Sequence, residues 1–176
     1  MEIIKLSTDE LSRRIPELRA GDYVHLSGTV YTARDAAHAR FLELISAGKE
    51  LPFELKDAVI YYAGPTPTKE NGQIGSFGPT TSARMDAFTP CLLDRGLTAM
   101  IGKGDRSPEV TDAIVRNSAV YFCAGGGLGA LISKSIVSCE EIAFPELGCE
   151  SVKRLTVRAF PLIVGIDCRG NSVFGK

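Results

Sequence analysis

The sequence lacks several features that mark metal sites and disulfide frameworks. Its cysteine count is odd and no CxxC pair occurs, which argues against a disulfide framework and against a zinc site. Only two histidines are present, and they do not stand at metal-ligand spacing. Cysteine ligands of iron–sulfur clusters are often grouped in sequence, so we expect reduced thiols here and no metal bound by this chain alone. The scattered cysteines are Cys91, Cys123, Cys139, Cys149 and Cys168.

Long apolar runs and a charge excess are also absent. No segment approaches the roughly 18 apolar residues that indicate a membrane span. The first residues, MEIIK, lack the basic-then-apolar order of a signal peptide, so we expect a cytoplasmic protein. The net charge of −1 provides no overall attraction for nucleic acid or an anionic membrane. Any recognition of anions must therefore come from a local site.

What the sequence does contain is an alternation of strand and helix patterns. Its 176 residues fit one domain, 1–176, and a hydrophobic content of 44% is ordinary for a globular protein. Helical spacing follows most strand-like runs, which predicts an α/β fold with a mixed sheet. We expect strands at 2–6, 22–32 (bulged at Gly28), 58–63, 97–101, 119–124, 155–160 and 162–167, and helices near 7–15, 34–47, 80–95, 107–117 and up to about 133.

Three loops that lead from a strand into a helix carry cations, and open α/β sheets bind ligands at such loops. They cover 32–38, 75–84 and 101–106. The second loop includes the end of a glycine- and proline-rich stretch, 64–79, which is longer than ordinary connections and so a candidate functional loop. These three loops predict where the local anion site lies.

The residue order of the second loop predicts a carboxylate pocket at the start of a helix. Gly78 allows close backbone approach and Pro79 presets the helix entry, so the N–H groups of Thr80 and Thr81 would point at an anion. Arg84 lies four residues after Thr80 on the same helix face, and an arginine holds a carboxylate through two parallel hydrogen bonds. The alternative is a capped helix with Arg84 in a surface salt bridge.

Three further loop residues are candidates, each with a simpler alternative. Arg34 begins a helix, where it either binds a ligand or stands in solvent or paired with Asp35. Lys103 stands between two glycines that leave its ammonium unobstructed, although a solvated turn has the same pattern. His38 follows Arg34 by four residues and faces the same site, unless it is a structural histidine. The glycine-rich run 125–129 lacks the complete GxGxxG pattern and is interpreted as a tight strand–helix turn.

Six segments of the chain resemble one known family, in the family's order. They are TARDAAHAR (32–40), YYAGPTPT (61–68), GSFGPTTSARMD (75–86), IGKGDRS (101–107), AGGGLGALISKSI (124–136) and FPELGCESV (144–152). The family is that of class I fumarase and L-tartrate dehydratase, specifically its C-terminal domain or separate β subunit. The combination of GPTTSARMD with RDAAH and IGKG is specific. One departure is Asp105, where many fused class I fumarases have asparagine, and it weakens any role assigned to Arg106.

The resemblance implies a fold, a partner and a set of site residues. The implied fold is a swivelling β/β/α domain with a mixed sheet and flanking helices. The implied partner is an α subunit that carries a four-iron, four-sulfur cluster, and none of the residues here binds that metal. Three cations match family positions that contact substrate, and one threonine matches a proposed catalytic hydroxyl. We expect Thr80 and Lys103 to be catalytic, and Arg34, His38, Thr81, Arg84 and Lys103 to bind substrate.

The implied function is the reversible hydration of fumarate to L-malate, a step of the tricarboxylic acid cycle. The chain is expected to be inactive without the α subunit, to assemble with it as α2β2, and to receive from it the acid that activates Thr80. The main alternative is the β subunit of L-tartrate dehydratase, which converts tartrate to oxaloacetate and which these residues do not distinguish. A non-catalytic dicarboxylate-binding module would need the same anion pocket.

Overall fold

The structure is a computed structural model that describes residues 1–67, 69–125 and 129–175. In these ranges one seven-stranded sheet has the order β1-β2-β3-β4-β5-β7-β6. Neighbouring strands among β1 to β5 are parallel, whereas β7 is antiparallel to β2, β5 and β6. The strands are β1 (Ile3–Ser7), β2 (Tyr23–Thr32), β3 (Val59–Tyr61), β4 (Ala99–Gly102), β5 (Val120–Cys123), β6 (Ile136–Ala143) and β7 (Val152–Ile166).

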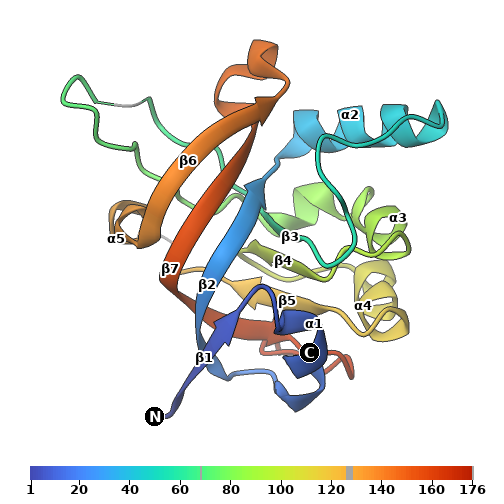
Figure 1. Cartoon of the computed structure of the whole chain (residues 1–176). Coiled ribbons are helices and arrows are strands. Elements are labelled where there is room, and N and C mark those ends of the chain that lie inside the picture. The colour runs from blue at the N-terminus through green and yellow to red at the C-terminus, as the bar shows by residue number, and fades with distance from the viewer. Residues whose placement is uncertain (68, 126–128, 176) are drawn as a thin grey trace.

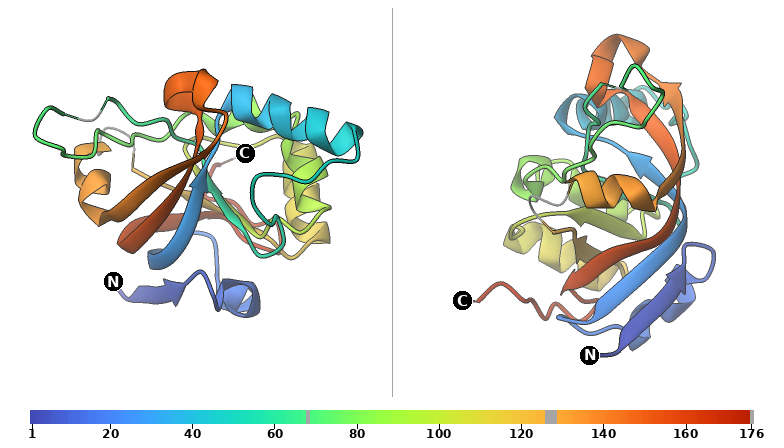
Figure 2. Two further views of the ribbon diagram at one scale, coloured as in Figure 1. Left: turned by 45° about the horizontal axis from the view of Figure 1, so that its top comes forward. Right: turned by 90° about the vertical axis from the view of Figure 1, so that its left-hand side faces the viewer.

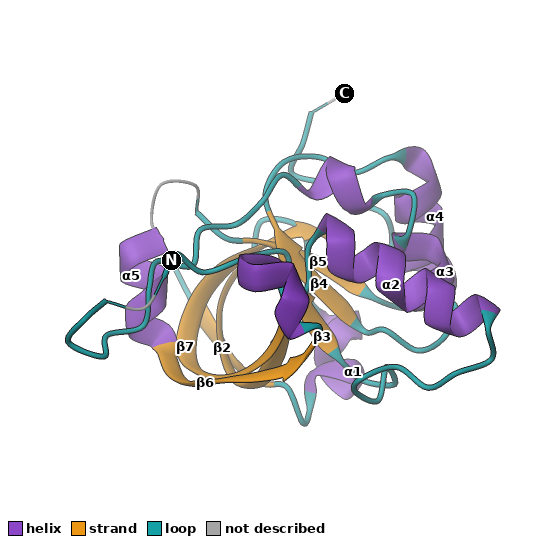
Figure 3. Cartoon of the chain, turned by 90° about the horizontal axis from the view of Figure 1, so that it is seen from above, coloured by secondary structure: helices purple, strands orange, loops and turns teal. Residues whose placement is uncertain are grey.

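The sheet closes on itself because β2 pairs with both β3 and β7. Strands β2, β3, β4, β5 and β7 therefore form a continuous circuit, and Figure 3 shows the sheet curving around a common centre. Apolar side chains from all five strands fill this centre, together with Leu11 and Ile15 from α1 (Leu11–Arg14) and η1 (Ile15–Glu17). Leu11 is fully buried, which contributes about 1.5–3 kcal/mol for a side chain of this kind.

Successive side chains of β3, and of Tyr62 directly after it, pack on opposite sides of the sheet. Val59 and Tyr61 belong to the central cluster, whereas Ile60 and Tyr62 belong to a second cluster under the helices. The continuous apolar run that predicted this strand thus fits burial on both faces. Figures 1 and 2 show three helices together on one side of the sheet. They are α2 (Asp35–Ser46), α3 (Thr89–Leu93) and α4 (Pro108–Arg116).

The predicted fold class, α/β with a mixed sheet and flanking helices, is confirmed. Helix α4 starts as its sequence indicates: Pro108 is its first residue, and Ser107 Oγ accepts a hydrogen bond from the Val110 N–H at 3.3 Å. The bulge expected in β2 is present, because the register with β7 shifts between Leu26 and Gly28. Gly28 has a φ of 121°, which favours glycine at this position. Among the described residues, no helix is long and apolar enough to cross a membrane.

The helix predicted over 80–95 is wrong. Thr80 and Thr81 precede the helical structure, which consists of η2 (Ser82–Met85) and, after a turn, α3. The reason is tertiary, since isolated bridges pair Ala63 with Pro79 and Thr81 with Lys103. These contacts with neighbouring strand ends hold the segment extended where its local spacing favours a helix.

The end of the chain also differs from the prediction. The two closing strands expected at 155–160 and 162–167 are parts of the single long strand β7. Strand β6 was not predicted, and most of its side chains are exposed, so its sequence lacks the apolar alternation that indicates a strand. The remaining short elements are α5 (Gly129–Ser135) and η3 (Pro145–Glu150).

The parallel strands bring their carboxyl ends to one edge of the sheet. The register pairs Thr32 with Tyr61, Tyr61 with Ile101, and Ile101 with Phe122. Chain segments that leave these strands therefore start side by side, although they are separated in sequence. This edge is where α/β sheets commonly bind ligands.

Candidate functional site

An ion pair joins the two loops that carry Arg34 and Arg84. Arg84 Nη2 donates a hydrogen bond to Asp35 Oδ2, although these residues stand 49 positions apart. Asp35 directly follows Arg34, so both arginines belong to one region of the molecule. The Arg84 side chain remains 52% exposed, and exposed ion pairs contribute only about 0–1 kcal/mol. A ligand carboxylate can therefore compete with Asp35 for this guanidinium at small cost.

Arg34 is more enclosed than Arg84. Its side chain is 23% exposed, and Arg34 Nε lies 3.8 Å from Glu150 Oε1, beyond hydrogen-bond distance. This buried nitrogen has no hydrogen-bond partner among the described residues. Gly64 makes room for the side chain, because a Cβ there would lie 3.3 Å from Arg34 Cδ and 2.7 Å from the Cys149 carbonyl oxygen. Arg34 thus has one unpaired buried donor, and the rest of its side chain remains partly exposed.

Thr80, Thr81 and Lys103 meet at the ends of β3 and β4. The Thr80 N–H donates to the Tyr62 carbonyl at 2.6 Å, and Thr81 bridges to Lys103 in parallel. The Ser82 N–H donates to the Lys103 carbonyl at 2.9 Å, which locks the same contact. Thr81 and Lys103 are exposed and Thr80 is half-buried. These residues come together, but the expectation that the Thr80 N–H points at an anion is wrong, because this N–H is already bonded.

Gly78 and Gly102 differ in the room that the chain leaves around them. A Cβ built on Gly78 would meet no atom within 4 Å, so the close approach of a ligand expected there stays a prediction. Gly102 is crowded, since its Cβ would lie 1.9 Å from Ser82 Oγ. The glycine that permits a close approach is thus the one before Lys103, on β4.

His38 lies beneath this surface and has no exposed area. Its Nδ1 is 2.8 Å from the Arg34 carbonyl oxygen, and its ring packs against Tyr62, Phe88 and Phe41. Burial lowers the pKa of His38 to about 4, so the imidazole is neutral near pH 7. The burial argues against the substrate contact predicted for His38, because its position at i+4 from Arg34 points into the core. The environment of His38 is that of a structural histidine, the alternative that the sequence left open.

A buried hydroxyl pair that sequence reasoning missed supports Lys103 from behind. Ser82 Oγ accepts the Lys103 N–H at 3.0 Å and lies 2.8 Å from the Tyr121 hydroxyl. Tyr121 in turn donates to the Gly104 carbonyl at 2.7 Å, and burial raises the pKa of its hydroxyl, which therefore stays protonated. Serine and tyrosine are too common to be recognised in sequence. The sequence signal that could have indicated this contact was Gly102, which leaves room for Ser82 Oγ.

The whole chain is similar to known proteins. The family described as "Fumarase C-terminus" matches residues 1–176. The chain belongs to this family. It is 38% identical over 175 residues to fumarate hydratase 2 of Leishmania major and 40% identical over 167 residues to the anaerobic class I fumarate hydratase of Escherichia coli. It is also 32% identical over 177 residues to the L(+)-tartrate dehydratase subunit beta of E. coli.

The two kinds of relative differ in length. The alignments cover 98% and 94% of this chain but only 31% and 30% of the two fumarate hydratases. The alignment with the tartrate dehydratase β subunit covers 97% of this chain and 86% of that protein. This member of the fumarase C-terminus family thus spans about a third of the fumarate hydratases and most of a tartrate dehydratase β subunit.

The sequence predicted that this chain alone binds no metal and that residues 125–129 form a strand–helix turn. In the part of the chain that the structure describes, no three histidine, cysteine or acidic residues are placed to hold a metal ion. Cys139 and Cys149 are exposed, and each of the five thiols is unpaired in the described structure. The interpretation of 125–129 as a strand–helix turn concerns residues 126–128, which lie outside the described ranges.

Proposed function

We propose that this chain is the β subunit of a hydro-lyase that interconverts fumarate and L-malate. The observation that carries the proposal is the contact of Arg84 with Asp35, next to Arg34, at the sheet edge where Lys103 also emerges. These three cations come from three separate loops, and a dicarboxylate has two anionic groups to bind. The family relationship supports the same reaction class.

The cations have two tasks in such a reaction. They bind the substrate carboxylates, and they stabilise the negative charge that spreads into a carboxylate when the carbon-bound proton leaves. Arg34 and Arg84 each offer planar pairs of donors that suit a carboxylate, whereas Lys103 supplies a compact charge. Asp35 orients Arg84 in the absence of substrate. We assign substrate binding to these three cations and Thr81, and a catalytic role to Lys103 as well.

Thr80 is the proposed proton-transfer residue. Its backbone is fixed by the hydrogen bond to Tyr62, and its side chain is half-buried beside the cations. A threonine hydroxyl is a weak base at neutral pH and needs an activating neighbour. No side-chain hydrogen bond of Thr80 occurs within the described residues, so the activating acid is proposed to come from the α subunit.

The four-iron, four-sulfur cluster does not fit this chain. The five cysteines are free thiols, and among the described residues no three histidine, cysteine or acidic side chains are placed to hold a metal ion. We therefore assign the cluster to a partner α subunit in an α2β2 assembly. The exposure of Arg84, Thr81 and Lys103 supports a site that a second polypeptide completes. The cytoplasmic location expected from the sequence remains a prediction.

The β subunit of L-tartrate dehydratase is the second candidate, because one such subunit is among the relatives of this chain. The two sequences are 32% identical over 177 residues. Tartrate differs from malate by one hydroxyl, and the same cations would bind both. The choice between them depends on hydroxyl donors that include residues of the partner.

Anaerobic co-expression with a cysteine-bearing α subunit tests the proposal. The purified assembly is assayed for hydration of fumarate and for dehydration of L-tartrate, and the chain alone serves as the control. We expect turnover of fumarate by the assembly and none by the chain alone. Faster turnover of tartrate would reassign the substrate. An assembly with no activity on either diacid would overturn the hydro-lyase proposal and favour a dicarboxylate-binding module.

A further inference from the structure

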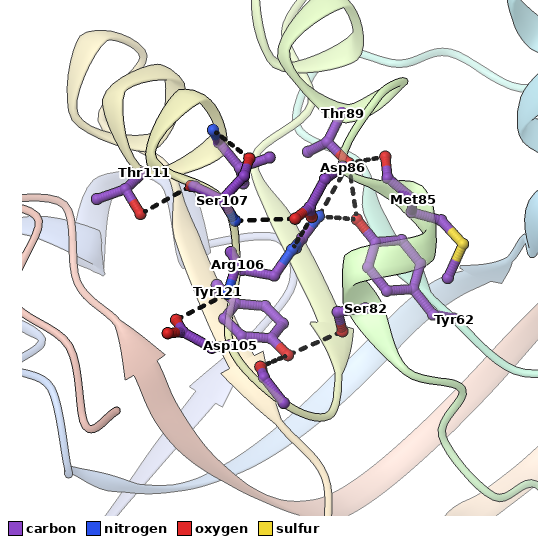
Figure 4. A network of polar contacts seen from close by, with 12 residues as sticks. Tyr62, Ser82, Met85, Asp86, Thr89, Asp105, Arg106, Ser107, Thr111 and Tyr121 are labelled. Atoms are coloured by element: carbon purple, nitrogen blue, oxygen red, sulfur yellow. Dashed lines mark hydrogen bonds and ion pairs between the residues drawn. The ribbon is translucent and has the colours of Figure 1, made fainter. Parts of the chain in front are cut away.

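Arg106 is a buried cation directly behind the proposed site. Its side chain has no exposed area, and it follows Lys103 by three residues on the turn after β4. Arg106 Nε pairs with Asp86 Oδ1 at 2.7 Å (Figure 4). Its Nη2 donates to the Tyr62 hydroxyl at 3.1 Å and to Thr89 Oγ1 at 2.9 Å. A charge held this deeply needs such partners, because burial of an unpaired cation is strongly unfavourable.

Aromatic rings complete the surroundings of the guanidinium. Its carbon lies 5.2 Å from the centre of the Tyr62 ring and 4.8 Å from that of Tyr121, distances at which a cation is attracted to a ring face. The remaining nitrogen, Nη1, is buried without a hydrogen-bond partner in the described residues. Arg106 therefore has no contact with solvent through which it would reach a substrate.

The partners of Arg106 lie next to segments that carry site residues. Asp86 follows η2, on which Arg84 lies, and its other oxygen accepts the Ser107 N–H at 2.8 Å. Thr89 Oγ1 also donates to the Met85 carbonyl at 2.8 Å, at the end of η2. Tyr62 follows β3, and its carbonyl holds the Thr80 N–H. One guanidinium thus connects the segments next to Lys103, Arg84 and Thr80, and Figure 4 shows its contacts with Asp86, Thr89 and Tyr62.

We propose that Arg106 is a positioning residue, which fixes Lys103, Arg84 and Thr80 relative to one another through Asp86, Thr89 and Tyr62. The effect of Arg106 on catalysis rests on the proposed function. Its effect on the positions of the three residues does not. Lysine at this position keeps the charge but is a point donor, so it cannot satisfy the three partners in their fixed directions. A displacement of about 1 Å in catalytic groups can cost about 10²-fold in rate.

Hydrogen exchange of the full chain tests the structural part without any enzyme assay. We expect Arg106→Lys to raise the exchange rates of the Thr80, Ser82 and Lys103 amides at least tenfold, while amides of β1 and β2 keep their rates. The matched control is Arg116→Lys, which alters an exposed arginine paired with Asp94 at 2.9 Å. Thr89→Val removes one acceptor and keeps the shape of the side chain, so it should give a smaller change of the same kind. This variant replaces Arg106→Lys in the test if Arg106→Lys folds poorly.

Kinetics of the co-expressed assembly test the catalytic part. Arg106→Lys should lower kcat/KM at least tenfold, mostly through kcat, and Arg116→Lys should change it less than twofold. In a Lys103→Ala background the same Arg106→Lys change should cost less than it does in the wild-type background, because one of the three groups that it positions is already missing. A merely structural role would give equal losses in both backgrounds.

Each result decides one claim. Unchanged exchange at the three site amides, or an equal increase throughout β1 and β2, overturns the positioning role. Additive losses in the double-variant comparison overturn its catalytic meaning. A wild-type assembly inactive on both diacids overturns the proposed function instead, and the exchange measurement then still decides whether Arg106 fixes the three segments.

Discussion

Asp35 links two arginines that lie on separate loops of the chain. Its carboxylate pairs with Arg84, and its backbone follows Arg34, so a single side chain places two guanidinium groups in one region. The sequence allowed either a ligand site or a surface salt bridge for Arg84. The structure shows the salt bridge, and its exposure makes it weak enough for a substrate carboxylate to replace.

Arg84→Lys should lower kcat/KM of the assembled enzyme by about 10- to 100-fold, although the charge is kept. A lysine cannot make the two parallel hydrogen bonds of a guanidinium to a carboxylate. Steady-state kinetics with fumarate and malate would measure this loss. Arg95→Lys, at an exposed arginine beyond α3, is the control and should leave kcat/KM unchanged. An unchanged value for Arg84→Lys would show that Arg84 does not hold substrate.

Thr80→Ala should lower kcat by at least about 100-fold with a small change in KM, because proton transfer is affected more than binding. The Thr80 N–H bond to Tyr62 uses the backbone, so the variant keeps the local fold. Thr80→Ser retains a hydroxyl and should recover much of the rate. Near-normal kcat for Thr80→Ala in the assembled enzyme would remove Thr80 from the mechanism.

His38 should make the stability of the chain fall as the pH falls from about 6.5 to about 4. Burial lowers the pKa of His38 from 6.5 to about 4, so in this window the unfolded state binds a proton that the folded state excludes. The linkage amounts to at most about 3 kcal/mol, lost progressively below pH 6.5 and complete near pH 4. Above pH 6.5 the imidazole is neutral in both states and contributes no pH dependence.

Urea unfolding at several pH values would measure this effect. His38→Gln keeps an amide donor near the Arg34 carbonyl but does not titrate, so its free energy of unfolding should depend less on pH between 4.5 and 6.5. His25→Gln is the matched control, since His25 is only half-buried on β2. Equal pH dependence for the wild type and His38→Gln would contradict the role of burial.

The helices and strands that could be predicted are those whose own residues indicate them. Helices α2 and α4 have clear starts and apolar spacing, and the central strands are apolar on both faces. The segment at Thr80 and Thr81 was not predictable, because contacts with Tyr62 and Lys103 override its helical spacing. Closure of the sheet depends on the pairing of β2 with β7, a distant contact without a sequence signature.

The contact between β4 and η2 gives a prediction at this scale. Gly102→Ala would place a Cβ 1.9 Å from Ser82 Oγ and 2.9 Å from Tyr62 Cδ2, so η2 must move. We expect a loss of about 1–3 kcal/mol in the free energy of unfolding, typical of overpacking. Gly78→Ala, where the Cβ meets nothing within 4 Å, should change stability by less than about 0.5 kcal/mol. Denaturant unfolding of both variants measures the difference, and equal stability would show that β4 and η2 tolerate separation.

Across the whole molecule, the sequence predicted which loops converge but not what holds them. The convergence followed from the edge of the parallel strands and from cations on three loops. Arg106, Ser82 and Tyr121 were missed, because their importance comes from burial behind the site. His38 was placed on the correct helix face relative to Arg34, yet that face points inward.

The exposure of the site predicts how the isolated chain binds dicarboxylates. Arg84 is paired with Asp35 and Arg34 lies near Glu150, so a dianion must compete with carboxylates of the chain itself. Water and salt screen the exposed charges further. We therefore expect the chain alone to bind succinate, an unreactive dicarboxylate, no more tightly than a Kd of about 1 mM, or about −4 kcal/mol.

Assembly with the α subunit should tighten this binding at least tenfold, because exclusion of water from the cations strengthens their interaction with the dianion. Isothermal titration calorimetry of the chain and of the assembly compares the two affinities directly. Arg84→Lys in the assembly should remove most of the gain, since it removes the two-donor contact. Micromolar binding by the isolated chain would contradict a shared site, because a pocket complete in one polypeptide is what a stand-alone dicarboxylate-binding module requires.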